Sequence, residues 1–320
     1  MVFNITECVD FHHGKRIVIT ILVCGHDVVI IMHKEGDALL IQQPVYYPFR
    51  EVIEDNGRIF VNNQLHYEDG KYTIDFEDFE KKIVDNNVKV FILCNPHNPV
   101  GRVWTKEELE KMGDICLKHN VVIMDDEIHC DFTYPGFKFT SFMTLDKKYH
   151  NSLVLYTSPS KTFNVAGLQP ANIIIKNPEL RAAYRKANVA AGYSQGSIMG
   201  QVAVKSVYTK GDEWVNELVE YITGNMNYMR DFVKENFPKA QFVDPEGTYL
   251  TWVDFSGYGF TDEELEHIMV EEAHIWLDSG KVFGPATAQF ERFNLACPRA
   301  TVVKAMEQLK AALDNHTKWA

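Results

Sequence analysis

Residues 88–129 read VKVFILCNPHNPVGRVWTKEELEKMGDICLKHNVVIMDDEIH, and this stretch predicts the fold class. An apolar run over Val88–Cys94 leads through a proline-rich turn into a helical pattern, and a second apolar run follows over Val121–Met124. Thr105 and Glu108 have the spacing of a capping box, and apolar residues recur behind them at helical intervals (Leu109, Met112 and Cys116). This strand–helix–strand order indicates two parallel strands in one sheet.

Further apolar runs flank this unit on both sides. We expect strands at Ala38–Gln42, Arg58–Val61, Leu153–Thr157 and Asn172–Lys176. Continuous apolar strands separated by helices predict an α/β fold, with a mainly parallel sheet covered by helices on both faces. Ligands of such sheets bind beyond the carboxyl ends of the strands, so polar residues that directly follow strands are the candidates for a site.

The pattern changes after about Asp212. A long helical stretch over Glu213–Asn236 precedes a strand-like run at Gly247–Asp254 and helical patterns at Asp262–Ala273 and Thr301–Asp314. We therefore expect a large domain over residues 1–212, and an interdomain helix with a smaller C-terminal α/β domain over residues 213–320.

Charge and composition limit the function classes. The chain of 320 residues carries a formal net charge of −12, which argues against nucleic acid or an anionic membrane surface as a partner. Apolar runs stay shorter than the roughly 20 residues of a membrane-spanning helix. Lys15-Arg16 ahead of Ile17–Cys24 resembles a signal peptide only faintly, since a small-residue cleavage site is missing. The six cysteines show no C-x-x-C spacing, so we expect a cytoplasmic protein without a disulfide framework.

Polar clusters follow two of the expected strands. Asn95–Gly101 contains two Asn-Pro pairs and a glycine, which enforce a tight turn after the first strand. Asp125-Asp126-Glu127-Ile128-His129 follows the next one, and carboxylates packed against an apolar strand need a partner. A metal held by Asp126, His129 and Asp131 is one alternative and a salt-bridged strand end is another. No second cluster of ligands has suitable spacing, so no metal is expected.

A lysine and an arginine complete the candidates. Lys161 in Ser158-Pro-Ser-Lys-Thr-Phe-Asn164 follows a strand, where the serine hydroxyls could hold a phosphate and a desolvated lysine could act as nucleophile and base. A serine acyl-enzyme with S-x-x-K would also need S-D-N and K-T-G, and the chain has neither. Arg292 in Arg292–Arg299 could present its planar fork to a carboxylate, or form a surface or interdomain salt bridge.

In order and spacing these segments resemble the fold-type I enzymes that use pyridoxal 5′-phosphate (PLP), the aminotransferase class I/II superfamily. More narrowly they resemble its MalY/PatB-type branch of cystathionine β-lyases and cysteine-S-conjugate β-lyases. The resemblance extends over about residues 34–315 and rests on Pro44–Phe49, Asn95–Gly101, Asp126–Asp131, Ser158–Gln169, Pro245–Tyr249 and Arg292–Arg299. It implies a PLP-binding large domain and PLP as the cofactor.

The resemblance also implies roles around the cofactor ring. Lys161 would hold PLP covalently and move the Cα proton of the substrate, and Asp126 would pair with the ring nitrogen. Asn98 would donate a hydrogen bond to the phenolic oxygen of the ring. Tyr46, placed with Lys161 in the catalytic set, would stack on the ring. His129 stands where many aminotransferases have a tyrosine that contacts the same phenolic oxygen.

The remaining implied roles concern the phosphate and the substrate. Ser158 and Ser160 would contact the phosphate, and Arg292 would bind the α-carboxylate of the substrate. Gln169 replaces a phosphate-binding arginine that is common in aminotransferases, which favours the lyase branch. The expected reaction is α,β-elimination of cystathionine or another cysteine S-conjugate to a thiol, pyruvate and ammonia, catalysed by a homodimer. An aminotransferase, and a catalytically weak binding or regulatory protein with this fold, are the alternatives.

The beginning of the chain departs from the pattern. Only 33 residues precede Lys34-Glu-Gly-Asp37, where relatives have several tens more, and Ile17–Met32 is dominated by Ile and Val. We therefore expect a shortened N-terminus in which part of the phosphate cup is missing and an exposed edge favours association. Phe283–Phe290 also differs from the more Gly- and Glu-rich loop of relatives.

Overall fold

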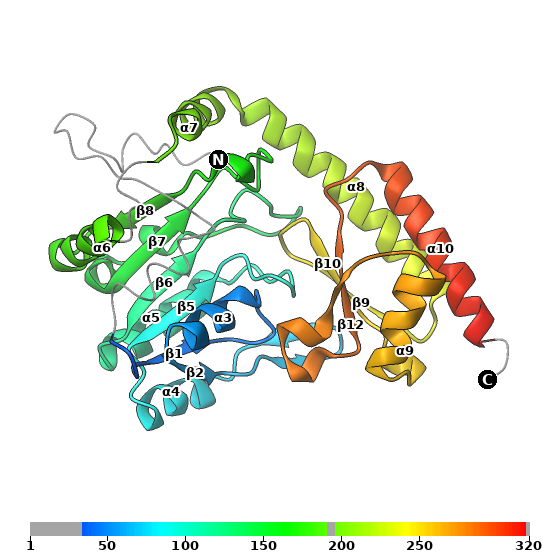
Figure 1. The fold of residues 1–320 in the computed structure, drawn as a ribbon, viewed down its shortest axis with the longest axis horizontal. Helices are drawn as coiled ribbons and strands as arrows, with labels where there is room; N and C mark the ends of the chain where they lie inside the picture. Colours follow the sequence, from blue (N-terminus) through cyan, green and yellow to red (C-terminus); the bar gives the residue numbers. More distant parts are fainter. Residues whose placement is uncertain (1–33, 191–195, 318–320) are drawn as a thin grey trace.

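A computed structural model describes residues 34–190 and 196–317 of the chain. Within these ranges a six-stranded sheet and a four-stranded sheet lie side by side, and helices cover both of them (Figure 1). The expectations for Ile17–Met32 concern residues outside the described ranges. No described helix is long and apolar enough to cross a membrane.

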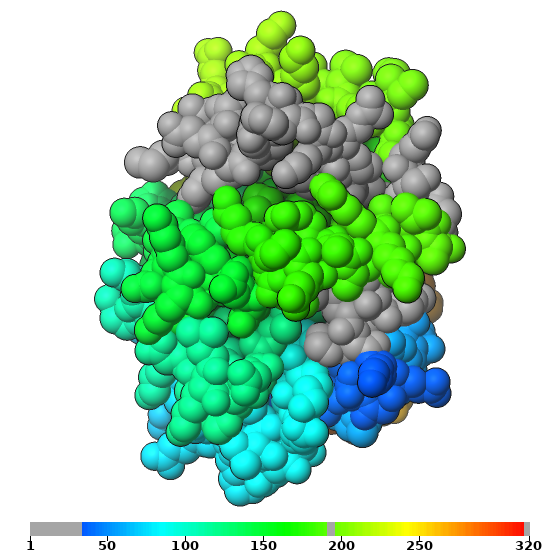
Figure 2. Space-filling model, turned by 90° about the vertical axis from the view of Figure 1, so that its left-hand side faces the viewer, coloured from blue at the N-terminus to red at the C-terminus, as the bar shows by residue number. Residues whose placement is uncertain are grey.

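The large sheet is mainly parallel, as the sequence predicts. In spatial order its strands are β2 (Ile59–Asn62), β1 (Ala38–Ile41), β5 (Val90–Cys94), β6 (Val122–Asp126), β7 (Leu153–Thr157) and β8 (Asn172–Ile175). The pairs from β2 to β7 are all parallel, whereas β8 runs antiparallel to β7 at the edge. Figure 2 shows this edge, where the segment of β8 and α6 crosses the middle of the face.

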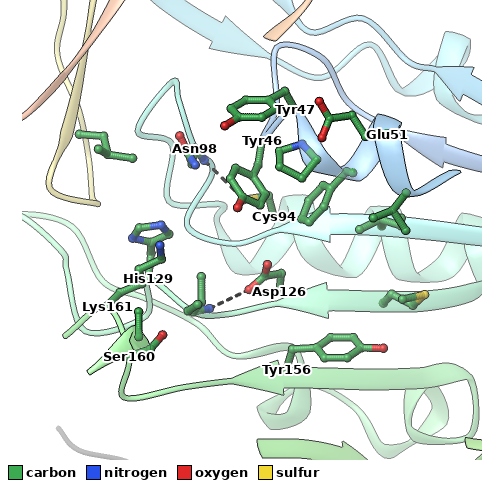
Figure 3. A pocket seen from close by; sticks show the side chains of 18 of the residues that line it. Tyr46, Tyr47, Glu51, Cys94, Asn98, Asp126, His129, Tyr156, Ser160 and Lys161 are labelled. Carbon is green, nitrogen blue, oxygen red and sulfur yellow. Dashed lines mark hydrogen bonds between the residues drawn. The ribbon is translucent and has the colours of Figure 1, made fainter. Parts of the chain in front are cut away.

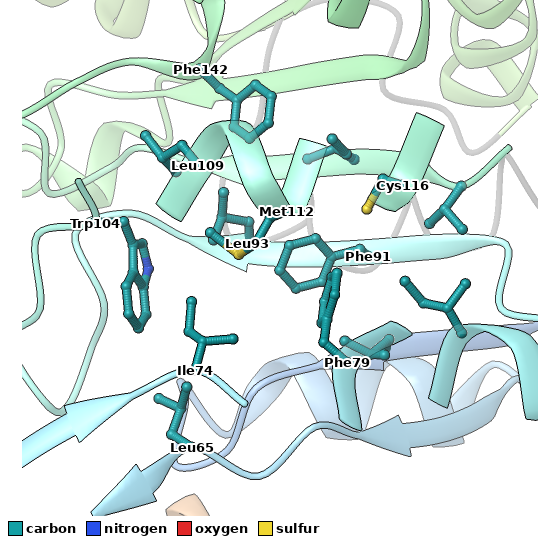
Figure 4. Packing of buried hydrophobic residues seen from close by; sticks show 14 of the residues in the cluster. Leu65, Ile74, Phe79, Phe91, Leu93, Trp104, Leu109, Met112, Cys116 and Phe142 are labelled. Atoms are coloured by element: carbon teal, nitrogen blue, oxygen red, sulfur yellow. The ribbon is translucent and has the colours of Figure 1, made fainter. Parts of the chain in front are cut away.

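Helices cover both faces of this sheet. The face with Leu40, Phe91 and Leu93 packs against α4 (Phe76–Asp85) and α5 (Lys106–Lys118) (Figure 4). The opposite face packs against α3 (Pro48–Asp55) and α6 (Pro178–Ala190). Successive side chains of a strand point to opposite faces of the sheet. A strand that is buried on both faces is therefore a continuous apolar run, and such runs could be predicted from the sequence.

Capping side chains mark the starts of the two helices α4 and α5, which cover one face of the large sheet. Thr105 and Glu108 form the predicted capping box at the start of α5. Asp75, which the sequence analysis did not single out, accepts hydrogen bonds from the backbone N–H groups of Glu77 and Asp78 at the start of α4.

The C-terminal part forms the second sheet. After α7 (Ile198–Lys210), the long helix α8 (Asp212–Asn236) leads to an antiparallel sheet. Its strands, in spatial order, are β11 (Asp278–Ser279), β12 (Phe290–Asn294), β10 (Leu250–Asp254) and β9 (Gln241–Val243). One face packs against α8, α9 (Asp262–His267) and α10 (Arg299–Thr317). The other face brings Trp252 and Phe290 into the core of the large sheet.

The structure adds detail that periodicity did not predict. The helix expected over Asp262–Ala273 divides into α9 and a π-helix at Ile268–Glu272. The strand expected from Gly247 begins only at Leu250. The sequence patterns did not predict the hairpin of β3 (His66–Glu68) and β4 (Lys71–Thr73). They also did not predict strands β9, β11 and β12.

The segment before β10 joins the two sheets. Its Glu246 and Gly247 donate backbone hydrogen bonds to the carbonyl oxygen of Gly101 over 2.8 and 2.9 Å. A Cβ atom at Gly101 would lie 2.6 Å from the Cβ atom of Pro245, and Gly101 has a φ of +74°, so only glycine suits this contact. Arg102 binds Glu246 through Nε over 2.9 Å, and their side chains are only 12% and 13% exposed.

Replacing Arg102 with Met should destabilise the protein strongly, because Glu246 would remain as a largely buried carboxylate without its cation. We expect a loss of about 3 kcal/mol in the free energy of unfolding, measured by urea denaturation. Lys81→Met breaks the exposed i,i+4 pair with Asp85 and should cost less than about 0.5 kcal/mol. Equal losses of unfolding free energy in the two variants would contradict a special role for Arg102 at this contact between the two sheets.

Candidate active site

A cavity of about 610 Å³ opens at the carboxyl ends of β5, β6 and β7, bordered by the small sheet. Seven of the eight predicted site residues line it, all but Ser158. Figure 3 labels six of them, Tyr46, Asn98, Asp126, His129, Ser160 and Lys161. Arg292 reaches the same cavity from β12. The structure thus brings together side chains that lie as far apart in the sequence as Tyr46 and Arg292.

Tyr46 and Asn98 occupy one wall of the cavity. The Tyr46 ring lies just ahead of α3 and meets the Phe49 ring edge-on at 5.6 Å between centroids, which restricts its orientation. Asn98 is buried in the turn after β5, where its backbone N–H donates to Cys94 Sγ over 3.5 Å. An aromatic face and an amide group are therefore presented side by side.

Asp126 ends β6 and directs its carboxylate into the cavity. One oxygen, Oδ1, accepts a hydrogen bond from the backbone N–H of Ile128 over 3.0 Å. Burial raises the pKa of Asp126 to about 6, although the Ile128 N–H and the charge of Lys161 act in the opposite direction.

Asp125 points the other way, because neighbouring residues of a strand face opposite sides of the sheet. It is fully buried, and neither of its carboxylate oxygens has a hydrogen-bond partner of good geometry among the described residues. Burial and the adjoining Glu127 carboxyl group raise its pKa well above the ordinary value. A salt-bridged strand end, one alternative from the sequence, is therefore wrong for Asp125, which faces another carboxyl group.

Lys161 lies in the loop after β7, opposite Asp126. Burial lowers its pKa, with Arg292 adding to this effect and Asp126 opposing it. A lysine that gives up its proton more readily suits both covalent bonding to a carbonyl group and proton transfer.

The two predicted phosphate ligands differ in their present contacts. The Ser158 hydroxyl donates to the carbonyl oxygen of Pro170 over 2.6 Å and accepts from the Ser160 N–H over 2.9 Å. The buried Ser160 Oγ has no hydrogen-bond partner among the described residues. Ser160 is thus free to bind a ligand, while the contacts of Ser158 hold the Ser160 backbone. Phosphate binding by either serine remains a prediction.

His129 is buried beside the Tyr249 ring, with 5.3 Å between the ring centroids. Burial, together with the charges of Lys161 and Arg292, lowers the pKa of His129 to about 3, so its imidazole is neutral at neutral pH. Its Nδ1 has no partner within the described ranges. Tyr249 is a wall residue to which the sequence analysis assigned no role, although it lies in the Pro245–Tyr249 motif.

Arg292 carries the second positive charge of the cavity. Its Nη1 donates to Asn98 Oδ1 over 2.8 Å, and its Nη2 donates to Asp278. The guanidinium also lies over the Phe283 ring, 4.9 Å from the centroid. Arg292 thus forms a salt bridge within the small sheet rather than between domains, and its binding of a substrate carboxylate stays a prediction.

These side chains fit PLP. Asp126 offers a carboxylate for a ring nitrogen, Tyr46 an aromatic face for the ring and Lys161 an amine for the aldehyde. The unpaired Ser160 hydroxyl suits a phosphate oxygen. In contrast, no group of three or more His, Cys, Asp and Glu side chains in the described part of the chain could hold a metal ion.

Comparison with known proteins agrees with this geometry. The family model described as aminotransferase class I and II matches residues 24–309. The chain belongs to the aminotransferase class I and II family. Among curated proteins, cystathionine β-lyase PatB of Bacillus subtilis is 41% identical over 87% of this chain and 72% of its own length. Protein MalY of Escherichia coli is 30% identical over 87% of this chain and 71% of its own length.

Solved structures give the same picture. Cystalysin from Treponema denticola, which contains PLP, superimposes with a TM-score of 0.91 at 37% identity, over 93% of this chain and 76% of that one. The PLP-bound C–S lyase from Staphylococcus hominis has a TM-score of 0.86 at 33% identity, over the same shares of the two chains. The fold-type I architecture predicted from the sequence is therefore confirmed.

The raised pKa of Asp126 predicts a pH dependence of stability without cofactor. Between the unfolded value of about 4 and the folded value of about 6, the native state binds more protons than the unfolded state. The wild type should therefore lose stability relative to Asp126→Asn as the pH rises through this window, by at most about 3 kcal/mol. Above it the difference should stay constant.

Urea denaturation of both proteins from pH 4 to pH 8 measures this difference. Asp125 and Glu127 titrate in both proteins, so most of their contribution cancels. Parallel stability curves across the whole range would contradict a raised pKa at Asp126.

Proposed function

We propose that the protein is a PLP-dependent carbon–sulfur β-lyase, which converts cystathionine or a related cysteine S-conjugate to a thiol, pyruvate and ammonia. One observation carries the proposal, namely that a partly desolvated lysine, a half-buried aspartate and an arginine share one cavity. The relatives named as cystathionine β-lyases support the choice of reaction.

Each residue has a defined task in this reaction. When bound, PLP supplies an electron sink for the negative charge that develops at Cα. Asp126 holds the ring nitrogen with its carboxylate, and Tyr46 holds the ring from one face. Arg292 binds the α-carboxylate and thereby orients the Cα–H bond toward Lys161. Lys161 Nζ removes that proton, and the thiolate leaves from Cβ.

The remaining residues tune the site. Asn98 accepts a hydrogen bond from Arg292 through Oδ1, so its amide N–H groups would be left to donate to the phenolic oxygen of the ring. His129 is neutral and can therefore donate or accept a hydrogen bond without adding charge. Ser160 offers its unpaired hydroxyl to the phosphate, with Ser158 as its support or as a second ligand.

Aminotransfer is the second candidate, because it needs the same proton removal at Cα. It is supported by more distant curated relatives such as the aspartate/prephenate aminotransferase of Aquifex aeolicus, described as probable and 25% identical. The higher identity to the named β-lyases and the glutamine at position 169 favour elimination. The binding or regulatory protein is the third candidate and is distinguished by turnover alone.

Supplying PLP and cystathionine without any keto acid tests the proposal. We expect pyruvate release, measured with a coupled dehydrogenase, and covalent attachment of the cofactor to Lys161 after borohydride reduction, located by peptide mass spectrometry. Lys161→Ala should lower turnover at least about a hundredfold, because proton transfer by a positioned base contributes that much. The exposed Lys147→Ala is the matched control. A strict need for a keto acid would favour aminotransfer, and absence of turnover would favour the binding protein.

We also propose a homodimer. On α7, Ile198, Met199 and Val202 are 77%, 64% and 55% exposed, and neighbouring exposed apolar side chains are typical of an interface. The domain boundary at residues 212 and 213 and a cytoplasmic location stay predictions.

Sedimentation velocity should give about twice the chain mass of 36.8 kDa. Ile198→Glu should shift the protein toward monomer if α7 lies in the interface, since a charge would then be buried without a partner. Glu substitution at the exposed Lys147 is the control, and a monomeric wild type would refute the dimer.

A further inference from the structure

The guanidinium of Arg292 already has a carboxylate partner in the protein. Asp278 lies on β11, directly opposite Arg292 on β12 in the antiparallel register, and accepts a hydrogen bond from Nη2. The Arg292 side chain is 13% exposed and that of Asp278 45% exposed. The ion pair therefore has one largely buried member and one member at the rim.

The other contacts of Arg292 orient it without neutralising it. Asn98 Oδ1 accepts from Nη1, and the Phe283 ring lies beneath the guanidinium. Both partners are uncharged, so they would keep the fork in place if Asp278 moved away. Asp278 therefore contributes mainly charge, whereas Asn98 and Phe283 contribute position.

A bound α-carboxylate competes directly with this pair. A bidentate grip through both terminal nitrogens uses one N–H group of each. Asp278 already binds Nη2, so an incoming carboxylate would lie beside a like charge at the same nitrogen. The half-exposed Asp278 carboxylate would regain hydration by turning into water, whereas Arg292 is held by its surroundings.

We infer that Asp278 is an internal counter-ion of Arg292, which the α-carboxylate of the substrate displaces on binding. This role rests on the proposed function only in naming the incoming carboxylate as that of an amino acid. Asp278 thereby sets the affinity of the site for carboxylates: a simple anion gains little by replacing it, whereas a substrate with further contacts in the cavity displaces it.

Propionate, a carboxylate without an amino group, is the probe. Its dissociation constant is measured by ligand-observed NMR titration with the full chain, with and without PLP. Asp278→Asn should bind propionate about three- to fivefold more tightly than the wild type, the range expected when a partly exposed ion pair no longer competes. Asp278→Ser should show the same direction, which guards against a local effect of the amide.

Three controls assign the gain to this contact. Propionamide, which has no charge, should bind wild type and variants alike. Asp244→Asn removes an acid from another partly exposed Arg–Asp pair, that of Arg230, and should leave propionate binding unchanged. Adding Arg292→Met to Asp278→Asn should abolish the gain, because the competition acts through the guanidinium.

Unchanged affinity in both Asp278 variants would overturn the inference, since the carboxylate would then bind without displacing Asp278. Weaker binding would overturn it as well and make Asp278 a support of Arg292. The titration needs neither turnover nor cofactor, so failure of the lyase reaction would leave this test intact.

Discussion

The contact between Gly101–Arg102 and Glu246 is the constraint on which the site depends. Glu246 accepts hydrogen bonds from Arg102 and from the backbone of Val103, so one carboxylate of the small-sheet side ties down the loop after β5. That loop carries Asn98, and the strand paired with β10 carries Arg292. This contact adds to the packing of Trp252 and Phe290 in the core of the large sheet. Together with the Arg292–Asn98 hydrogen bond, it fixes the two halves of the cavity relative to each other.

Side chains of β6 point alternately to its two faces, and this alternation separates the Asp126 carboxylate from that of Asp125. Asp126 faces the cavity, where Lys161 opposes its charge, while Asp125 is turned toward the apolar core on the other face. Two adjacent aspartates that look equivalent in the sequence therefore have different environments and different roles. Burial disfavours the charged form of both, but only Asp126 has a cation within reach and a ligand space in front of it.

Much of the fold was predictable, for a physical reason that also explains the misses. Strands β1, β5, β6 and β7 are buried on both faces, so each is a continuous apolar run with little ambiguity. The strands of the small sheet are short, and β12 contains Glu291, Arg292 and Asn294, which hid it among polar residues. Its pairing with β10 is a long-range contact that no local pattern encodes. The same holds for Asp278, whose significance appears only when β11 lies beside β12.

The chemical groups of the site and their order along the chain follow directly from the amino-acid sequence. The motifs around Asn98, Asp126 and Lys161 each follow a strand, and parallel strands bring their carboxyl ends to one edge, so their meeting was predictable. Three further properties arise from the three-dimensional packing. Arg292 meets Asn98 across 194 residues, the charge of Arg292 is already paired, and His129 is neutral. Pairing and desolvation depend on which atoms surround a group, and that is a property of packing between distant segments rather than of local sequence.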